Sequence, residues 1–84
     1  MDNVEQRAVI RMADHFAFKK DYYSASKSYL LALTIFKDRL SNLREARIRL
    51  KYGLVLMTID YPHLAFEQFS LAISLVPENS DNLK

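Results

Sequence analysis

The chain of 84 residues is 50% hydrophobic and 26% charged, with a net charge of +2, one glycine and two prolines. A chain of this length can build one small domain, and so few glycines and prolines favour long helices over a fold rich in turns. Because there is no cysteine, disulfides, thiolate zinc sites and cysteine nucleophiles are excluded.

The longest apolar runs, YLLALTIF and GLVLMTI, are much shorter than the ~20 residues of a membrane-spanning helix. The first residues, MDNVEQR, lack the apolar segment of a secretory signal peptide. We therefore expect no membrane contact and favour an intracellular location, cytoplasmic or nuclear, although the compartment stays open.

The first half of the chain predicts two helices. Residues 4 to 18 place Val9, Met12, Ala13 and Phe16 on one face, at the spacing i, i+3, i+4 and i+7. Asp21 is a suitable N-cap for a second helix that runs to about residue 36. Its common face comprises Tyr22, Ala25, Tyr29, Ala32 and Phe36, and we expect Leu30, Leu31 and Leu33 to widen it.

The second half predicts two more helices and the start of another. Ser41 or Asn42 can cap a third helix that runs to about residue 59. Pro62 suits the first turn of a fourth helix, which continues to residue 76 and stops at Pro77. The segment ENSDNLK resembles the beginning of a further helix, with Ser80 or Asp81 as its N-cap. The predicted fold is all-α, with two antiparallel helical hairpins.

The two hairpins repeat each other with a period of 40 residues. The matching pairs are Ala13 and Gly53, Phe16 and Leu56, Ala25 and Ala65, Tyr29 and Phe69, Ala32 and Ala72, and Lys37 and Pro77. A helix-turn-helix unit that recurs at such a period is typical of a solenoid, in which each unit buries its apolar face against its neighbours. The alanines would let the two helices of each hairpin approach closely.

This pattern resembles the tetratricopeptide repeat family, and the segments YGLVL, AFEQF, LAISLVP and ENSD of the second unit match it closely. The segments ADHF and DYYSASKSYLLAL of the first unit match it less fully. The resemblance implies a single repeat domain over residues 1–84, with unit one at about 6–39 and unit two at about 46–79. The chain departs from the pattern at Val9 and Arg49, where a tryptophan-like residue is usual, and at Lys37, where a proline is usual. Its period is also longer than the usual 34.

Basic residues recur at equivalent places of the two units. Arg44, Arg47 and Lys51 share one helical face, and Arg7 and Arg11 take the places of Arg47 and Lys51 forty residues earlier. In the family that the chain resembles, such positions line a concave groove for peptides. The resemblance therefore implies a partner polypeptide with an acidic segment, gripped by guanidinium groups that donate paired hydrogen bonds. The predicted groove comprises Arg7, Ile10, Arg11, Asp14, Arg47, Leu50, Lys51 and Leu54.

Two observations qualify the groove. Ile10 and Asp14 stand where the carboxylate clamp of heat-shock co-chaperones has lysine and asparagine, so we do not expect that clamp. The charges also admit a plainer interpretation as a solvated face, in which Arg11 pairs with Asp14 and Arg44 pairs with Asp38.

The fourth predicted helix is apolar over more than half of its circumference, so a single hairpin cannot cover it. We name Leu64, Leu71 and Leu75 the leucine stripe. Exposing three leucines is costly in a small domain. We therefore expect a homodimer, or a subunit or fragment of a longer array, with this stripe buried in the contact.

No arrangement of residues predicts an enzyme, a metal site or a cofactor. His15 and His63 are 48 positions apart and lack the spacing of metal ligands. The leading hypothesis is a scaffold or adaptor that binds another protein. Two alternatives are nucleic-acid binding by the REARIRLK helix and a purely structural role in an assembly.

Overall fold

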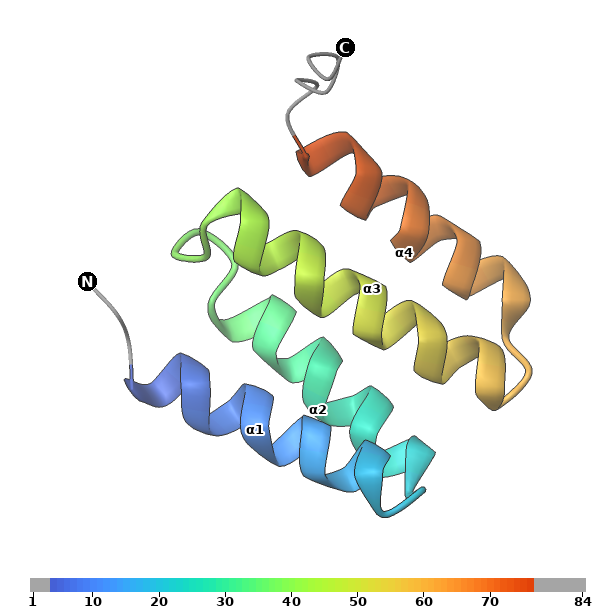
Figure 1. Cartoon of the computed structure of the whole chain (residues 1–84). Coiled ribbons are helices and arrows are strands. Elements are labelled where there is room, and N and C mark those ends of the chain that lie inside the picture. Colours follow the sequence, from blue (N-terminus) through green and yellow to red (C-terminus); the bar gives the residue numbers. More distant parts are fainter. Residues whose placement is uncertain (1–3, 77–84) are drawn as a thin grey trace, which may run out of the picture.

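The computed structural model describes residues 4–76, which form the helices α1 (Val4–Phe18), α2 (Tyr22–Ile35), α3 (Asn42–Thr58) and α4 (Pro62–Leu75). Each helix packs chiefly against the next along the chain, so that α1 and α2 form one antiparallel hairpin and α3 and α4 form another (Figure 1). The predicted all-α fold of two stacked hairpins is confirmed. The predicted start of a further helix at Ser80 or Asp81 lies outside the described residues.

The helix starts follow from local capping. The Asp21 carboxylate accepts a hydrogen bond from the Ser24 backbone N–H at 3.3 Å, which caps α2 as predicted. Ser41 rather than Asn42 caps α3, because its hydroxyl accepts from the Arg44 N–H at 3.1 Å. Pro62 occupies the first turn of α4, where a missing N–H costs nothing.

The turns inside the two hairpins have the same backbone geometry, shifted by 40 residues. Lys20 and Asp60 both adopt the left-handed conformation, with φ of 67° and 70°. In the first turn the Asp21 N–H donates to the Phe16 carbonyl at 2.8 Å, and in the second the Tyr61 N–H donates to the Leu56 carbonyl at 2.8 Å. The repeat seen in the sequence is therefore a repeat of structure.

Small residues line the closest helix contacts. Ala13, Ala25, Ala32, Ala65 and Ala72 are all buried, as is Gly53. The core around them includes Tyr29, Leu33, Ile48, Tyr52, Val55 and Leu56. Because helices approach closely only where side chains are small, these residues set the spacing within each hairpin.

Three predicted core positions are wrong. Met12 of α1 is exposed, and so are Leu30 and Leu31 of α2. The face of α2 that packs between its neighbours carries Tyr29 and Leu33, so the intervening leucines point outward. An unbroken apolar run does not by itself show which face of a helix is covered.

Candidate functional site

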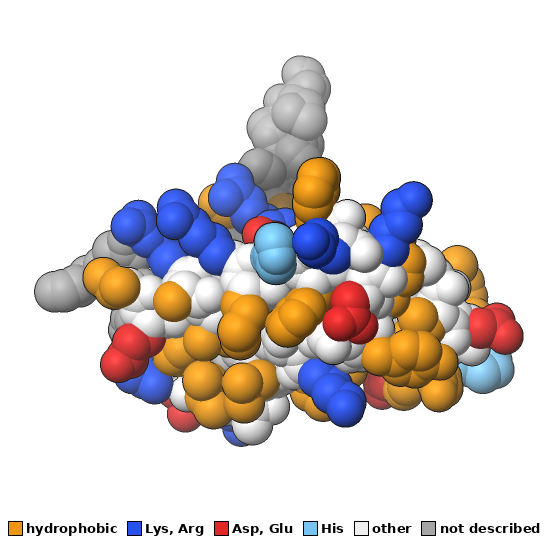
Figure 2. Space-filling view, turned by 90° about the horizontal axis from the view of Figure 1, so that it is seen from below, with side chains coloured by type: hydrophobic (Ala, Val, Ile, Leu, Met, Phe, Trp, Pro, Cys, Tyr) orange, Lys and Arg blue, Asp and Glu red, His pale blue; other side chains and the backbone are white. Residues whose placement is uncertain are grey.

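A cleft of about 240 Å³ lies between α1 and α3, and we name it the basic cleft. Its lining comprises Arg7, Ile10, Arg11 and Asp14 from α1, and Arg44, Arg47, Ile48 and Lys51 from α3. Six of the eight predicted groove residues are thus brought together, and Arg44 and Ile48 join them. Figure 2 shows Lys and Arg side chains gathered along one edge of the molecular face it presents, beside a band of hydrophobic side chains.

The other two predicted groove residues, Leu50 and Leu54, are both exposed on α3. Leu54 contributes to a second cleft of about 220 Å³, which continues along the helices toward the end of α1. Lys51 lines both clefts. We name this second one the apolar cleft, and it is lined by Ala17, Tyr22, Tyr29, Lys51, Leu54, Val55 and Thr58. Leu50 is not part of either lining.

Asp14 is the one acidic residue that lines the basic cleft, and it links three helices. Its carboxylate accepts a short hydrogen bond of 2.5 Å from the Tyr29 hydroxyl of α2. It also accepts bonds from the Lys51 Nζ of α3 at 3.2 Å to each oxygen. Asp14 therefore pairs across the cleft with Lys51 instead of along α1 with Arg11.

The environment of Tyr29 favours its neutral form. Burial raises the pKa of the Tyr29 phenol far above its ordinary value of 10.0, and the hydrogen bond to Asp14 and the charge of Asp14 raise it further. The hydroxyl therefore stays a hydrogen-bond donor even where an ordinary tyrosine would ionise, and it holds the Asp14 carboxylate in the lining of the cleft.

One lining residue of the basic cleft, Arg44, is held in place by Gln6, which sequence reasoning did not single out. This side chain is buried, and its Nε2 donates to the Arg39 carbonyl at 3.4 Å. Its Oε1 accepts from the Arg44 Nη1 at 3.1 Å, which fixes that guanidinium beside α1. The sequence carries one signal for this position, since the 40-residue period sets Gln6 over the apolar residue Ala46. The structure shows that both positions are buried.

Two guanidinium groups in the cleft are available to a ligand. Within residues 4–76, neither Arg11 nor Arg47 has a hydrogen-bond or ion-pair partner, and both are exposed. They belong to different helices, so a ligand lying between α1 and α3 can meet both. Five basic side chains face the cleft against one carboxylate that Tyr29 and Lys51 already engage, and the site therefore favours an anion.

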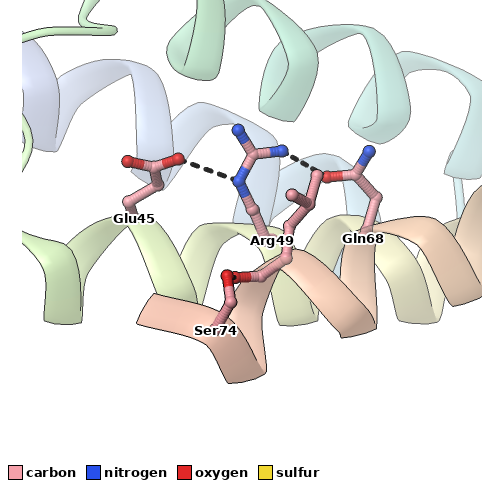
Figure 3. Close-up of polar contacts among 5 residues, drawn as sticks. Glu45, Arg49, Gln68 and Ser74 are labelled. Carbon is pink, nitrogen blue, oxygen red and sulfur yellow. Dashed lines mark hydrogen bonds and ion pairs between the residues drawn. The ribbon is translucent and has the colours of Figure 1, made fainter. Parts of the chain in front are cut away.

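Arg49 lies outside the cleft although it belongs to the same basic segment. Its Nε donates to the Glu45 carboxylate at 2.9 Å, and its Nη1 donates to the Gln68 amide oxygen of α4 at 2.6 Å (Figure 3). The equivalent position of the first hairpin carries an apolar residue, Val9. Here a polar bridge joins α3 to α4 instead.

The leucine stripe lies on the outer side of α4. Leu64 and Leu71 are exposed, and Leu75 is partly buried.

Among the described residues, no group of three or more histidines, cysteines or acids could hold a metal ion. None of the helices in residues 4–76 has the length and hydropathy to cross a bilayer.

Comparisons of this chain with protein-family models, with curated proteins and with solved structures find no significant match.

Proposed function

We propose that this chain is a non-catalytic binding module that takes an acidic, extended segment of another polypeptide into the groove between α1 and α3. The observation that carries the proposal is the basic cleft, where five cationic side chains from two helices surround one engaged carboxylate. Arginine suits such a role because its planar group donates two parallel bonds to a carboxylate.

The apolar cleft favours a peptide as the ligand over a small anion. It follows the basic cleft along the helices and shares Lys51 with it. A segment that places acidic side chains beside Arg11 and Arg47 could set an apolar side chain between Tyr22 and Leu54. Such alternation of charge and apolar contact gives specificity that a charged surface alone lacks.

Membership of the tetratricopeptide repeat family is part of this proposal. The matching backbone geometry of the two hairpin turns and the buried small residues at a fixed period support it. Arg49 and the longer period are departures from the usual pattern. The leucine stripe remains available as a second contact for the same partner or another one.

Binding is tested by fluorescence anisotropy with a short labelled peptide of alternating glutamate and leucine, and with the matching glutamine and leucine peptide. We expect the wild-type protein to prefer the glutamate peptide. The Arg47→Glu variant should weaken binding by about tenfold or more, because a charge-assisted hydrogen bond is replaced by repulsion. Lys27→Glu is the matched control, since it makes the same change of charge at an exposed site on α2.

Equal losses in the two variants would contradict a defined cleft and indicate a general charge effect. A labelled single-stranded oligonucleotide, titrated at several salt concentrations, separates the alternative function. Oligonucleotide binding that is tighter than peptide binding and falls steeply with salt would favour a nucleic-acid partner.

A further inference from the structure

Because the two hairpins repeat each other, each residue in the contact between α2 and α3 has an equivalent on α4 or α1. Inside, α2 packs on α3. On the α2 side, Leu33 is only 8% exposed and belongs to the same buried cluster as the α3 residues. On the α3 side, Ile48 and Tyr52 are 2% and 8% exposed. Among the described helices, α2 and α3 make the main packing contact between the two hairpins.

The equivalent positions at the ends are uncovered. On α4, Ile73 takes the place of Leu33, and it is 71% exposed. On α1, Ala8 and Met12 take the places of Ile48 and Tyr52, and both are exposed, Met12 at 44%. Within residues 4–76, the chain therefore presents both halves of its own internal contact, one on α4 and one on α1.

We infer that a second copy of this chain covers these faces, with α4 of one copy lying on α1 of the next as α2 lies on α3 (Figure 1). The two halves differ from each other, so the contact is head-to-tail and is not two-fold symmetric. Glu67 is the one charged residue of α4, so this helix brings no cluster of charges into the contact. A contact made by one pair of helices is small, and association is expected to be weak.

The repeat also shows that this surface is distinct from the leucine stripe. Leu71 and Leu75 correspond to Leu31 and Ile35 of α2. Those residues are 45% and 44% exposed even though α2 has a helix on either side. A stack built by the internal contact accordingly leaves Leu71 in solvent, which makes it a control position.

Stacking of this kind would also repeat the basic cleft. Arg47 and Lys51 of one copy would lie beside Arg7 and Arg11 of the next, because α3 and α1 carry these pairs at equivalent positions. A head-to-tail contact leaves one free half at each end, so that the stack remains open to further copies.

Sedimentation equilibrium of the intact chain tests the inference, at concentrations up to about 0.5 mM because small interfaces associate weakly. The weight-average mass of the wild type should rise with concentration beyond that of a dimer. Ile73→Glu and Met12→Glu should each remain monomeric, while Leu71→Glu should behave as the wild type does. All three side chains are exposed, and far-ultraviolet circular dichroism checks that the helices persist.

Mixing the two interface variants is the decisive step. Each variant keeps one intact half, so an equimolar mixture should form a dimer with one copy of each and nothing larger. A wild type that stays monomeric over the whole range would overturn the inference. A mixture that stays monomeric would also overturn it. So would a loss of association in Leu71→Glu but not in Ile73→Glu, because that result would place the contact on the leucine stripe.

Discussion

The ring of Phe69 lies directly over the backbone of Gly53, where α4 comes close to α3. A Cβ atom added to Gly53 would lie 2.8 Å from Cδ1 and 3.0 Å from Cζ of that ring, which is closer than such atoms normally approach. In the first hairpin the equivalent residues are Ala13 and Tyr29, and the Tyr29 hydroxyl bonds to Asp14. The single glycine of the chain thus has a packing role in the middle of a helix.

Gly53→Ala should therefore destabilise the protein even though alanine is the better helix former. Overpacking costs about 1–3 kcal/mol, and the gain in helix propensity offsets about 1 kcal/mol of it. Urea unfolding should show a net loss, which the double variant Gly53→Ala with Phe69→Leu recovers in part. A gain of stability in the single variant would mean that the ring moves aside freely.

The buried alanines of α4 should be as intolerant of larger side chains. Ala65→Leu or Ala72→Leu should lower the free energy of unfolding by about 1–3 kcal/mol, because both residues lie against α3 with almost no exposed surface. The control is Ser70→Leu, which adds the same side chain at an exposed position of α4. Thermal unfolding that is unchanged in the alanine variants, or changed equally in the control, would refute this account of helix spacing.

The sequence was sufficient to predict the features that repeat. Hairpin turns, helix caps and buried alanines depend on local chemistry and on spacing, both of which are visible in one dimension. The period of 40 residues even locates the core, because Ala25 and Ala65 are buried alike.

The polar contacts of the site could not be predicted in the same way. Asp14 pairs with Lys51, which is 37 residues away, and Arg44 meets Gln6 across 38 residues. Such pairs depend on which side chains face each other when the helices pack, whereas charge patterns along one helix suggest only near neighbours such as Arg11. The prediction that Leu30 is buried failed for a related reason, because the apolar run around it has no period that distinguishes the covered face of the helix.

The bridge from Arg49 to Gln68 should stabilise the contact between α3 and α4. Removing it by Arg49→Met should cost about 1–2 kcal/mol, because the group is partly buried and donates to a carboxylate and an amide. Arg49→Lys should lose less, since it keeps the charge but not the two-armed geometry. Arg47→Met is the matched control on the same helix and should change stability by less than about 0.5 kcal/mol. Equal effects at the two positions in urea unfolding would argue against the bridge.

The raised pKa of Tyr29 predicts a loss of stability at high pH. In the unfolded chain this phenol ionises near its ordinary pKa of 10.0, whereas in the folded protein burial and Asp14 keep it protonated well beyond that value. Below pH 10 the contribution is fully present, and above it the unfolded state gains stability as it loses the proton. The free energy of unfolding should fall by up to about 1.4 kcal/mol per pH unit from this group. Tyr52, whose pKa is also raised by burial, acts in the same direction.

Tyr29→Phe separates the hydrogen bond from the titration. At pH 7 the variant should be less stable by about 1–2 kcal/mol, because Asp14 loses its donor. Above pH 10 its stability should fall less steeply than that of the wild type, and the two curves should converge. Urea unfolding between pH 7 and 11 measures both effects, with Tyr23→Phe as the control because that side chain is exposed. An identical slope in Tyr29→Phe and the wild type would show that Asp14 and burial do not hold this proton.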